Sequence, residues 1–207
     1  MATTVEKFLN PKLTISLSDI VQKGKTRLAN ISDNKGNPIK IVLAKDCSLR
    51  TPWNVSSFDG GARCTLDIIM NDQLEKLVDK VDDAVLSIVK GKPERYFNNP
   101  PKDLTEWYRS LRKEASKEGY ANTLRCKCTM GENKASFKCW DADRNLMTYE
   151  DIRNIDWPES VLACEVALRG VYCQSNTFGP MLEVVSAMVK REDDVCPFDG
   201  CVDMSSE

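Results

Sequence analysis

The sequence contains no histidine, the side chain that most often transfers protons near neutral pH. It also has no run of ~18 apolar residues that could cross a membrane. Residues 1–7 lack the basic and apolar regions of a secretory signal, and no glycine-rich phosphate loop, Gly-x-Ser-x-Gly turn or Cys/His pair is present. We therefore expect a protein that is not an enzyme, has no cofactor and contacts no membrane.

Cysteine, in contrast, is plentiful. The nine cysteines are odd in number and lie in strand-like segments, which indicates reduced thiols and an intracellular protein, in the cytoplasm or nucleus of the host cell. Cys126, Cys128 and Cys139 could hold a structural zinc ion. However, a Cys-x-Cys in one strand points both sulfurs to the same apolar face, which favours core packing, so no metal site is predicted.

The net charge of -2 hides an uneven distribution. Residues 192–207 contain six acidic and no basic residues, so the rest of the chain carries a net charge of +4. The length of 207 residues suits one sizeable core. We expect a single domain over residues 1–191, followed by a flexible acidic tail over residues 192–207.

Most of the chain has the patterns of β-strands. Alternation in residues 13–17 and a β-branched run in 39–44, preceded by turn formers in 33–38, predict two strands and a hairpin; residues 62–70 predict another strand. Residues 123–129 and 135–140 predict a second hairpin, and residues 161–172 and 181–189 predict a long strand pair. Gly170 would permit a bulge where the sheet curls. The prediction is a mainly β (α+β) fold with a curved or barrel sheet.

Two helices are expected to interrupt these strands. Apolar residues recur at helical spacing from Leu74 to Val89, with Asp72 in the N-cap position. Residues 104–117 show the same spacing and end before Gly119. The sequence therefore predicts a two-helix insertion over about residues 72–118.

Several basic and aromatic residues are candidates for nucleic-acid contacts. In the predicted hairpin, one face presents Arg125, Lys127, Lys138 and Trp140; cations neutralise phosphates and an exposed ring stacks on an unpaired base. Alternatively, Trp140 covers the sheet edge as core and the cations are simply solvated. Arg109, Arg112, Lys113 and Lys117 cluster on one side of the second predicted helix, although charged helix faces are often only solvated surface.

The segment from Ser48 to Phe58 adds Arg50 and Trp53 to these candidates. An aromatic loop beside a basic sheet could clamp a flexible strand; alternatively, Trp53 plugs one end of a barrel. In the tail, Asp193, Asp194 and Phe198 are candidates for partner binding, because an acidic segment with an apolar anchor can compete with DNA or recruit proteins. A tail that only aids solubility is the other interpretation.

Catalysis has one weak candidate. Asp141 and Asp143 flank Ala142 after a predicted strand, and two carboxylates so spaced can hold Mg²⁺. The same residues, Asp-Ala-Asp-Arg-Asn, also form an ordinary turn sequence. A metal-dependent nuclease therefore stays an alternative, without a catalytic residue assigned.

The order of these parts resembles a known family. Strands with a helical insertion, a long strand ending Gly170-Val-Tyr172, a turn at Phe178-Gly-Pro180 and an acidic tail are similar to the OB-fold single-stranded DNA-binding proteins of large DNA viruses and phages. The resemblance spans about residues 39–207. It implies an OB-like sheet, no cofactor, binding of single-stranded DNA, and contacts of the tail with replication proteins.

The favoured hypothesis is thus a non-catalytic single-stranded DNA-binding protein that acts in DNA replication, recombination or repair. The alternative is a structural or scaffold domain, of the virion type, that would use the same sheet to bind protein.

Overall fold

The computed structural model describes residues 2–23, 26–57 and 62–192. Asp193, Asp194 and Phe198 lie outside the described residues, as does Phe58, and the division into one domain and a tail stays a prediction. The described strands are β1 (Thr3–Thr4), β2 (Ile15–Lys23), β3 (Thr26–Asp33), β4 (Ile39–Arg50), β5 (Ser56–Ser57), β6 (Arg63–Ile69), β7 (Arg112–Lys113), β8 (Thr123–Thr129), β9 (Lys138–Trp140), β10 (Ser160–Cys173) and β11 (Phe178–Arg191). The helices are α1 (Val5–Phe8), α2 (Asp72–Gly91) and α3 (Tyr149–Arg153), with 3-10 turns η1 (Pro93–Arg95) and η2 (Leu104–Trp107).

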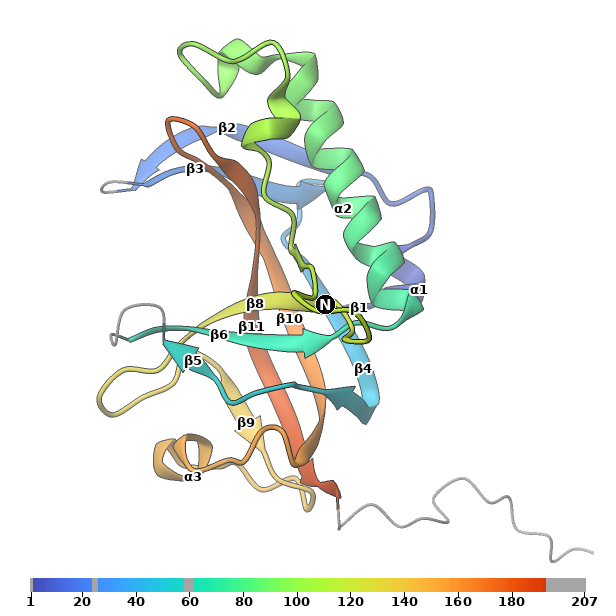
Figure 1. Ribbon diagram of the computed structural model, residues 1–207, viewed down its shortest axis with the longest axis vertical. Coiled ribbons are helices and arrows are strands. Elements are labelled where there is room, and N and C mark those ends of the chain that lie inside the picture. Colours follow the sequence, from blue (N-terminus) through green and yellow to red (C-terminus); the bar gives the residue numbers. More distant parts are fainter. Residues whose placement is uncertain (1, 24–25, 58–61, 193–207) are drawn as a thin grey trace, which may run out of the picture.

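The long hairpin of β10 and β11 is the centre of a curved sheet (Figure 1). The main strand order is β1-β4-β10-β11-β8-β6-β5. Strand β3 extends the sheet by pairing with the C-terminal end of β10, from Gly170 to Cys173. The register of β10 against β11 shifts between Glu165 and Val166 and between Leu168 and Gly170, which confirms the expected irregularity at Gly170. A Cβ at Gly170 would lie 2.4 Å from the Ala29 carbonyl oxygen, so glycine lets β3 approach. The mainly β, α+β class is confirmed.

Helix α2 packs across the sheet because one of its faces is wholly apolar. Leu74, Leu77, Val81 and Val85 on this face are fully buried. The helix begins one residue earlier than expected, since the side chain of Asn71 is the N-cap and accepts hydrogen bonds from the next turn. Within the described residues, no helix is long and apolar enough to cross a membrane.

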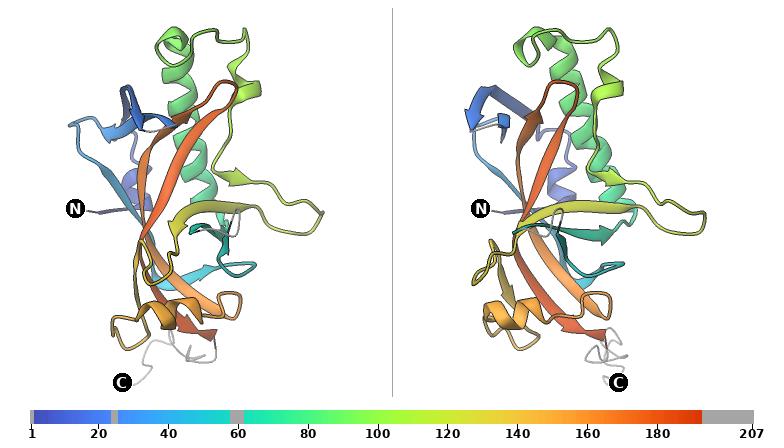
Figure 2. Two further views of the ribbon diagram at one scale, coloured as in Figure 1. Left: turned by 90° about the vertical axis from the view of Figure 1, so that its left-hand side faces the viewer. Right: turned by 60° about the vertical axis from the view of Figure 1, so that its left-hand side comes forward.

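The second helix of the predicted insertion is replaced by η2 and an extended segment that leads to β7 (Figure 2). Two of the apolar residues that suggested a helix, Trp107 and Tyr108, belong instead to an aromatic cluster around Phe178 at the start of β11. Tyr108 bridges to Phe178, and the two rings lie 5.2 Å apart. The ring of Phe97 contacts both Phe178 and Trp107. Tertiary packing thus overrides the local helical pattern.

Both predicted hairpins also pair differently. Strand β8 pairs with β6, and β9 pairs in parallel with β11, so residues 123–129 and 138–140 do not pair with each other along their lengths. In the first half, the turn at residues 33–38 forms as expected, with Asp33 accepting hydrogen bonds from Lys35 and Asn37. However, β2 pairs with β3, a strand that the sequence patterns did not predict, and β4 pairs with β10. Local alternation identified the strands, and the predicted pairing of β10 with β11 is confirmed, but the partners of β4, β8 and β9 were not predicted.

Candidate nucleic-acid interface

A groove of about 890 Å³ lies where the chain around β7 meets β6, β8 and the turn end of the β10–β11 hairpin. We call it the basic groove. The cationic residues that line it are Arg63, Arg109, Arg112, Lys113, Arg125 and Lys127. Tyr108 and Tyr172 contribute aromatic surface, and Glu114 is the acidic residue in the lining. Six cations from separate segments therefore converge on one concave surface.

A buried carboxylate lies beneath this surface. Asp67 on β6 is 2% exposed; its two oxygens lie 3.5 Å from Lys113 Nζ and 3.5 Å from Arg125 Nε. Asp67 is opposite Arg125 in the β6–β8 register, which fixes the second contact. Lys113 and Arg125 share the single negative charge of Asp67, so the three side chains together keep a net positive charge. The carboxylate also positions both cations.

Lys127 lies further along β8. Its ammonium is 5.4 Å from the centre of the Tyr172 ring, a cation–π distance. Desolvation, followed by the charge of the nearby Arg63, lowers the pKa of Lys127. A neighbouring phosphate would stabilise the charged form of this ammonium and so raise its pKa again.

Trp53 borders the groove through a contact with Lys113. The Lys113 ammonium lies 4.3 Å from the centre of the Trp53 ring, and Trp53 is 38% exposed. Of the two interpretations of Trp53, an exposed aromatic beside the basic surface fits this position. The ring offers a face on which an unpaired base could stack.

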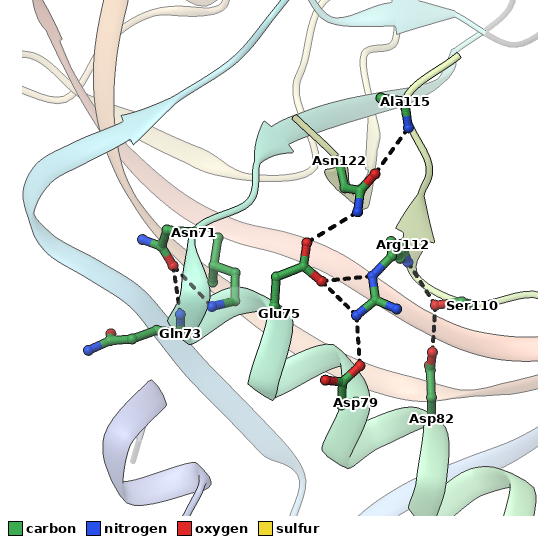
Figure 3. A network of polar contacts seen from close by, with 10 residues as sticks. Asn71, Gln73, Glu75, Asp79, Asp82, Ser110, Arg112, Ala115 and Asn122 are labelled. Atoms are coloured by element: carbon green, nitrogen blue, oxygen red, sulfur yellow. Dashed lines mark hydrogen bonds and ion pairs between the residues drawn. The ribbon is translucent and has the colours of Figure 1, made fainter. Parts of the chain in front are cut away.

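Arg112 has a structural role in the wall of the groove (Figure 3). Its Nε donates to Glu75 Oε2 at 2.8 Å, and its Nη2 donates to Asp79 Oδ1 at 2.7 Å. The Asn122 amide donates to the other oxygen of Glu75 and accepts from the backbone of Ala115, which closes the loop between β7 and β8. Because two carboxylates of α2 neutralise its guanidinium, Arg112 adds no net positive charge to the groove.

The next contacts of this wall are also with α2. The hydroxyl groups of Tyr108 and Ser110 donate to the two oxygens of Asp82, at 2.6 and 2.5 Å. Burial raises the pKa of Asp82, while these hydrogen bonds act in the opposite direction. Arg109 directs its Nη1 to the carbonyl oxygens of Glu106 and Tyr108, so it braces the segment while it lines the groove. The predicted helical stripe of cations is thus an extended wall.

Arg50 lies outside the basic groove. Its guanidinium forms a bidentate ion pair with Glu192, the first residue of the predicted tail. The hydrogen bond from Arg50 lowers the pKa of Glu192. This contact joins the end of β4 to the end of β11, so the structure separates Arg50 from the other candidates.

Lys138 and Trp140 are also separate from the groove. The inward positions of Cys126, Cys128 and Cys139 and the outward positions of Lys127 and Lys138 are as expected. But β9 runs beside Ser186 to Met188 of β11, and neither Lys138 nor Trp140 is among the residues lining the groove. Trp140 is partly buried and bridges to Leu146. Of the predicted basic face, Arg125 and Lys127 therefore line the groove, whereas Lys138 and Trp140 do not.

Of the candidates for metal binding, Asp141 and Asp143 lie in a turn, and Cys126, Cys128 and Cys139 are buried in the core. Asp141 accepts hydrogen bonds from the backbone and side chain of Asn145, which lower its pKa and close a turn. Burial raises the pKa of Cys128 and of Cys139 to about 12, so both thiols stay protonated. Among the described residues, no three His, Cys, Asp or Glu side chains are placed to hold a metal ion.

Sequence reasoning missed Arg63 and Tyr172 as groove residues. Both lie in strands that it predicted, at positions that alternation alone could have placed on the surface. The missing information was the pairing of β6 with β8, which brings Arg63 near Lys127, a groove residue of β8.

Comparisons with known proteins give a match to solved structures only. No family model and no curated protein matches the chain. The crystal structure of gp2.5, a single-stranded DNA-binding protein of bacteriophage T7, matches with 16% identity and a TM-score of 0.44, covering 82% of this chain and 98% of the other. The single-stranded DNA-binding protein of bacteriophage Enc34 matches with 11% identity and a TM-score of 0.45, covering 92% and 98%. Its complex with single-stranded DNA matches with 10% identity and a TM-score of 0.44, covering 86% and 97%.

These matched proteins are of the class that the sequence resembles.

Proposed function

We propose that this protein binds single-stranded DNA in the basic groove and catalyses no reaction. The observation that supports the proposal is the convergence of Arg63, Lys113, Arg125 and Lys127 on one concave surface beside Trp53. Cations placed along a groove neutralise successive phosphates, and aromatic rings at its border stack on unpaired bases. A surface that combines both features suits a flexible polyanion with accessible bases.

A single strand suits this site better than a duplex. Stacking on an exposed ring stabilises binding by ~1–3 kcal/mol per base, but only when the base is unpaired. Trp53 and Tyr172 border the groove at different places, so two bases of one strand could be contacted. A duplex presents paired and stacked bases and would use the cations alone.

The wider role follows from this activity. We propose that the protein acts in DNA replication, recombination or repair inside the cell, where single strands are exposed. The acidic segment after Glu192, with Asp193, Asp194 and Phe198, is proposed to contact replication proteins and to compete with DNA for the basic groove.

The test is a fluorescence-anisotropy titration of labelled single-stranded and duplex oligonucleotides at several salt concentrations. We expect tighter binding of the single strand, with an affinity that falls as salt rises. Lys127→Ala should weaken binding about fivefold to tenfold and reduce the slope of log affinity against log salt by about 0.7.

Lys138→Ala is the matched control, because Lys138 is exposed on β9 and does not line the groove. Equal effects of the two substitutions would contradict the assignment of the groove. Binding of no oligonucleotide at any salt concentration would contradict the function itself and favour a protein-binding scaffold.

A further inference from the structure

A second hollow, of about 590 Å³, opens beside the basic groove; we call it the recess. The residues that line only the recess include Cys128, Thr129, Arg169 and Glu183. The residues that line both hollows are Arg63, Lys127, Met181 and Leu182. The recess and the groove are therefore adjacent, and these four residues form the divide between them.

Strand pairing explains why the recess exists. Strands β8 and β11 pair through a single residue pair, Lys127 with Glu183. Further along the same edge of β11, from Ser186 onward, the pairing partner is β9. Because β8 turns away to pair with β6 along its whole length, it diverges from β11 and leaves space on one side of the pair.

The surface of the recess has an apolar floor and a polar rim. Cys128 and Leu182 are nearly fully buried and form part of the floor. At the rim, Arg169 Nε donates to Glu183 Oε2 at 2.6 Å, which puts a guanidinium donor beside a carboxylate acceptor. Lys127 is on the side shared with the groove.

We propose that the recess receives one nucleobase, turned out of a DNA strand that lies in the basic groove. This inference rests on the proposed function. A nucleobase has flat apolar faces that suit the floor, and an edge with both donors and acceptors that suits Arg169 and Glu183. The flanking phosphates would then lie near Arg63 and Lys127, and the volume is within the range of small-ligand sites.

All four bases carry both a donor and an acceptor on the Watson–Crick edge. The recess therefore selects a nucleobase as a chemical class and does not select one base.

The experiment uses the full chain and abasic positions in DNA. The shortest oligo-dT that binds as tightly as a long one is synthesised with a single abasic nucleotide at each position in turn. We expect one position at which loss of the base weakens binding about tenfold, beyond the smaller losses elsewhere. Equal losses at every position would overturn the proposal.

A substitution that fills the recess provides the second arm. Thr129 is exposed and lines only the recess, so Thr129→Phe should occupy the space without disturbing the core. We expect this variant to bind the intact and the abasic oligonucleotide equally well at the sensitive position. Met181→Phe, from the divide, is the second variant in case the first alters folding. Ser87→Phe, on the exposed side of α2, is the control and should keep the sensitivity.

The outcomes separate this proposal from the function on which it rests. Normal binding of intact oligo-dT with an undiminished sensitive position in both filled variants would overturn the recess and leave the groove intact. Failure of the unmodified protein to bind any oligonucleotide would overturn both.

Discussion

Asp67 Oδ2 lies 3.5 Å from the ammonium of Lys113, and the carboxylate is buried beneath the basic groove. The other oxygen of Asp67 lies 3.5 Å from Arg125 Nε. A buried anion below a binding surface has two opposite effects. It positions both cations, and it reduces the positive charge that a phosphate would meet.

Asp67→Asn keeps the shape of the side chain and removes its charge. We expect the free energy of unfolding to fall by about 1–2 kcal/mol, because the buried group loses two ionic partners that are themselves partly hydrated. The affinity for single-stranded DNA should depend more steeply on salt, since the groove gains net positive charge. Urea unfolding and oligonucleotide titrations measure the two effects. Unchanged values in both would show that Asp67 does not act on these cations.

Arg112 and Lys113 are neighbours whose substitutions should differ. Arg112→Ala removes the bonds to Glu75 and Asp79, so it should lower the free energy of unfolding by about 1–2 kcal/mol. Lys113→Ala removes a cation that is 44% exposed in the groove, so it should reduce the salt dependence of DNA binding with a smaller effect on stability. The reverse pattern would contradict the assignment of Arg112 as a structural residue.

The lowered pKa of Lys127 should make the proposed DNA binding depend on pH. The ammonium form binds phosphate, and it is lost as the pH rises through the lowered pKa, so affinity should fall at a lower pH than for ordinary lysines. Bound DNA favours the protonated form, so binding in this range should take up a proton. Lys127→Arg should remove this part of the pH dependence, because arginine stays charged. Titrations between about pH 7 and 10 measure it; identical profiles for both proteins would exclude Lys127.

Gly179 leaves room for the backbone of the groove wall, residues 108–114, to pass close to β11. A Cβ at this residue would lie 2.1 Å from the Arg109 carbonyl oxygen, and the Arg109 amide donates to the Phe178 carbonyl at 2.8 Å. Gly179→Ala should destabilise the protein by about 1–3 kcal/mol and weaken DNA binding, because the wall must move. Gly91→Ala is the matched control, since a Cβ at the end of α2 would meet no other segment within 4 Å. Equal thermal stability of the two variants would contradict this account.

The sequence predicted what local patterns determine. Alternation identified the strands around Cys126 and Val166, and the apolar spacing from Leu74 to Val89 identified α2. Gly170 was expected to mark an irregularity, and the register shifts there. Each of these features depends on residues that are close together in the chain.

Pairing between distant segments could not be predicted in this way. Residues 104–117 have helical spacing, but Tyr108 packs on Phe178, seventy residues later, and the helix does not form. The hairpin expected from residues 123–140 forms only at its turn, where Met130 pairs with Ala135, because β9 has its partner in β11.

The site was predicted in part. Lys113, Arg125, Lys127 and Trp53 come together at the groove. Arg50 lies elsewhere, paired with Glu192, and Arg112 lines the groove but is held by Glu75 and Asp79 of α2. Residue type identified the cations. Which of them have a carboxylate partner depends on contacts between segments far apart in the sequence.

The central hairpin has a consequence for how the protein unfolds. Strand β10 pairs with β3, β4 and β11, and β11 pairs also with β8 and β9, so every other described strand reaches the sheet through these two. Amide protons in the middle of β10 should therefore exchange with solvent only when the whole molecule opens. In the wall formed by residues 108–114, β7 pairs with β8 through only two residues, so amide protons there should exchange sooner, and the groove should widen while its floor stays folded.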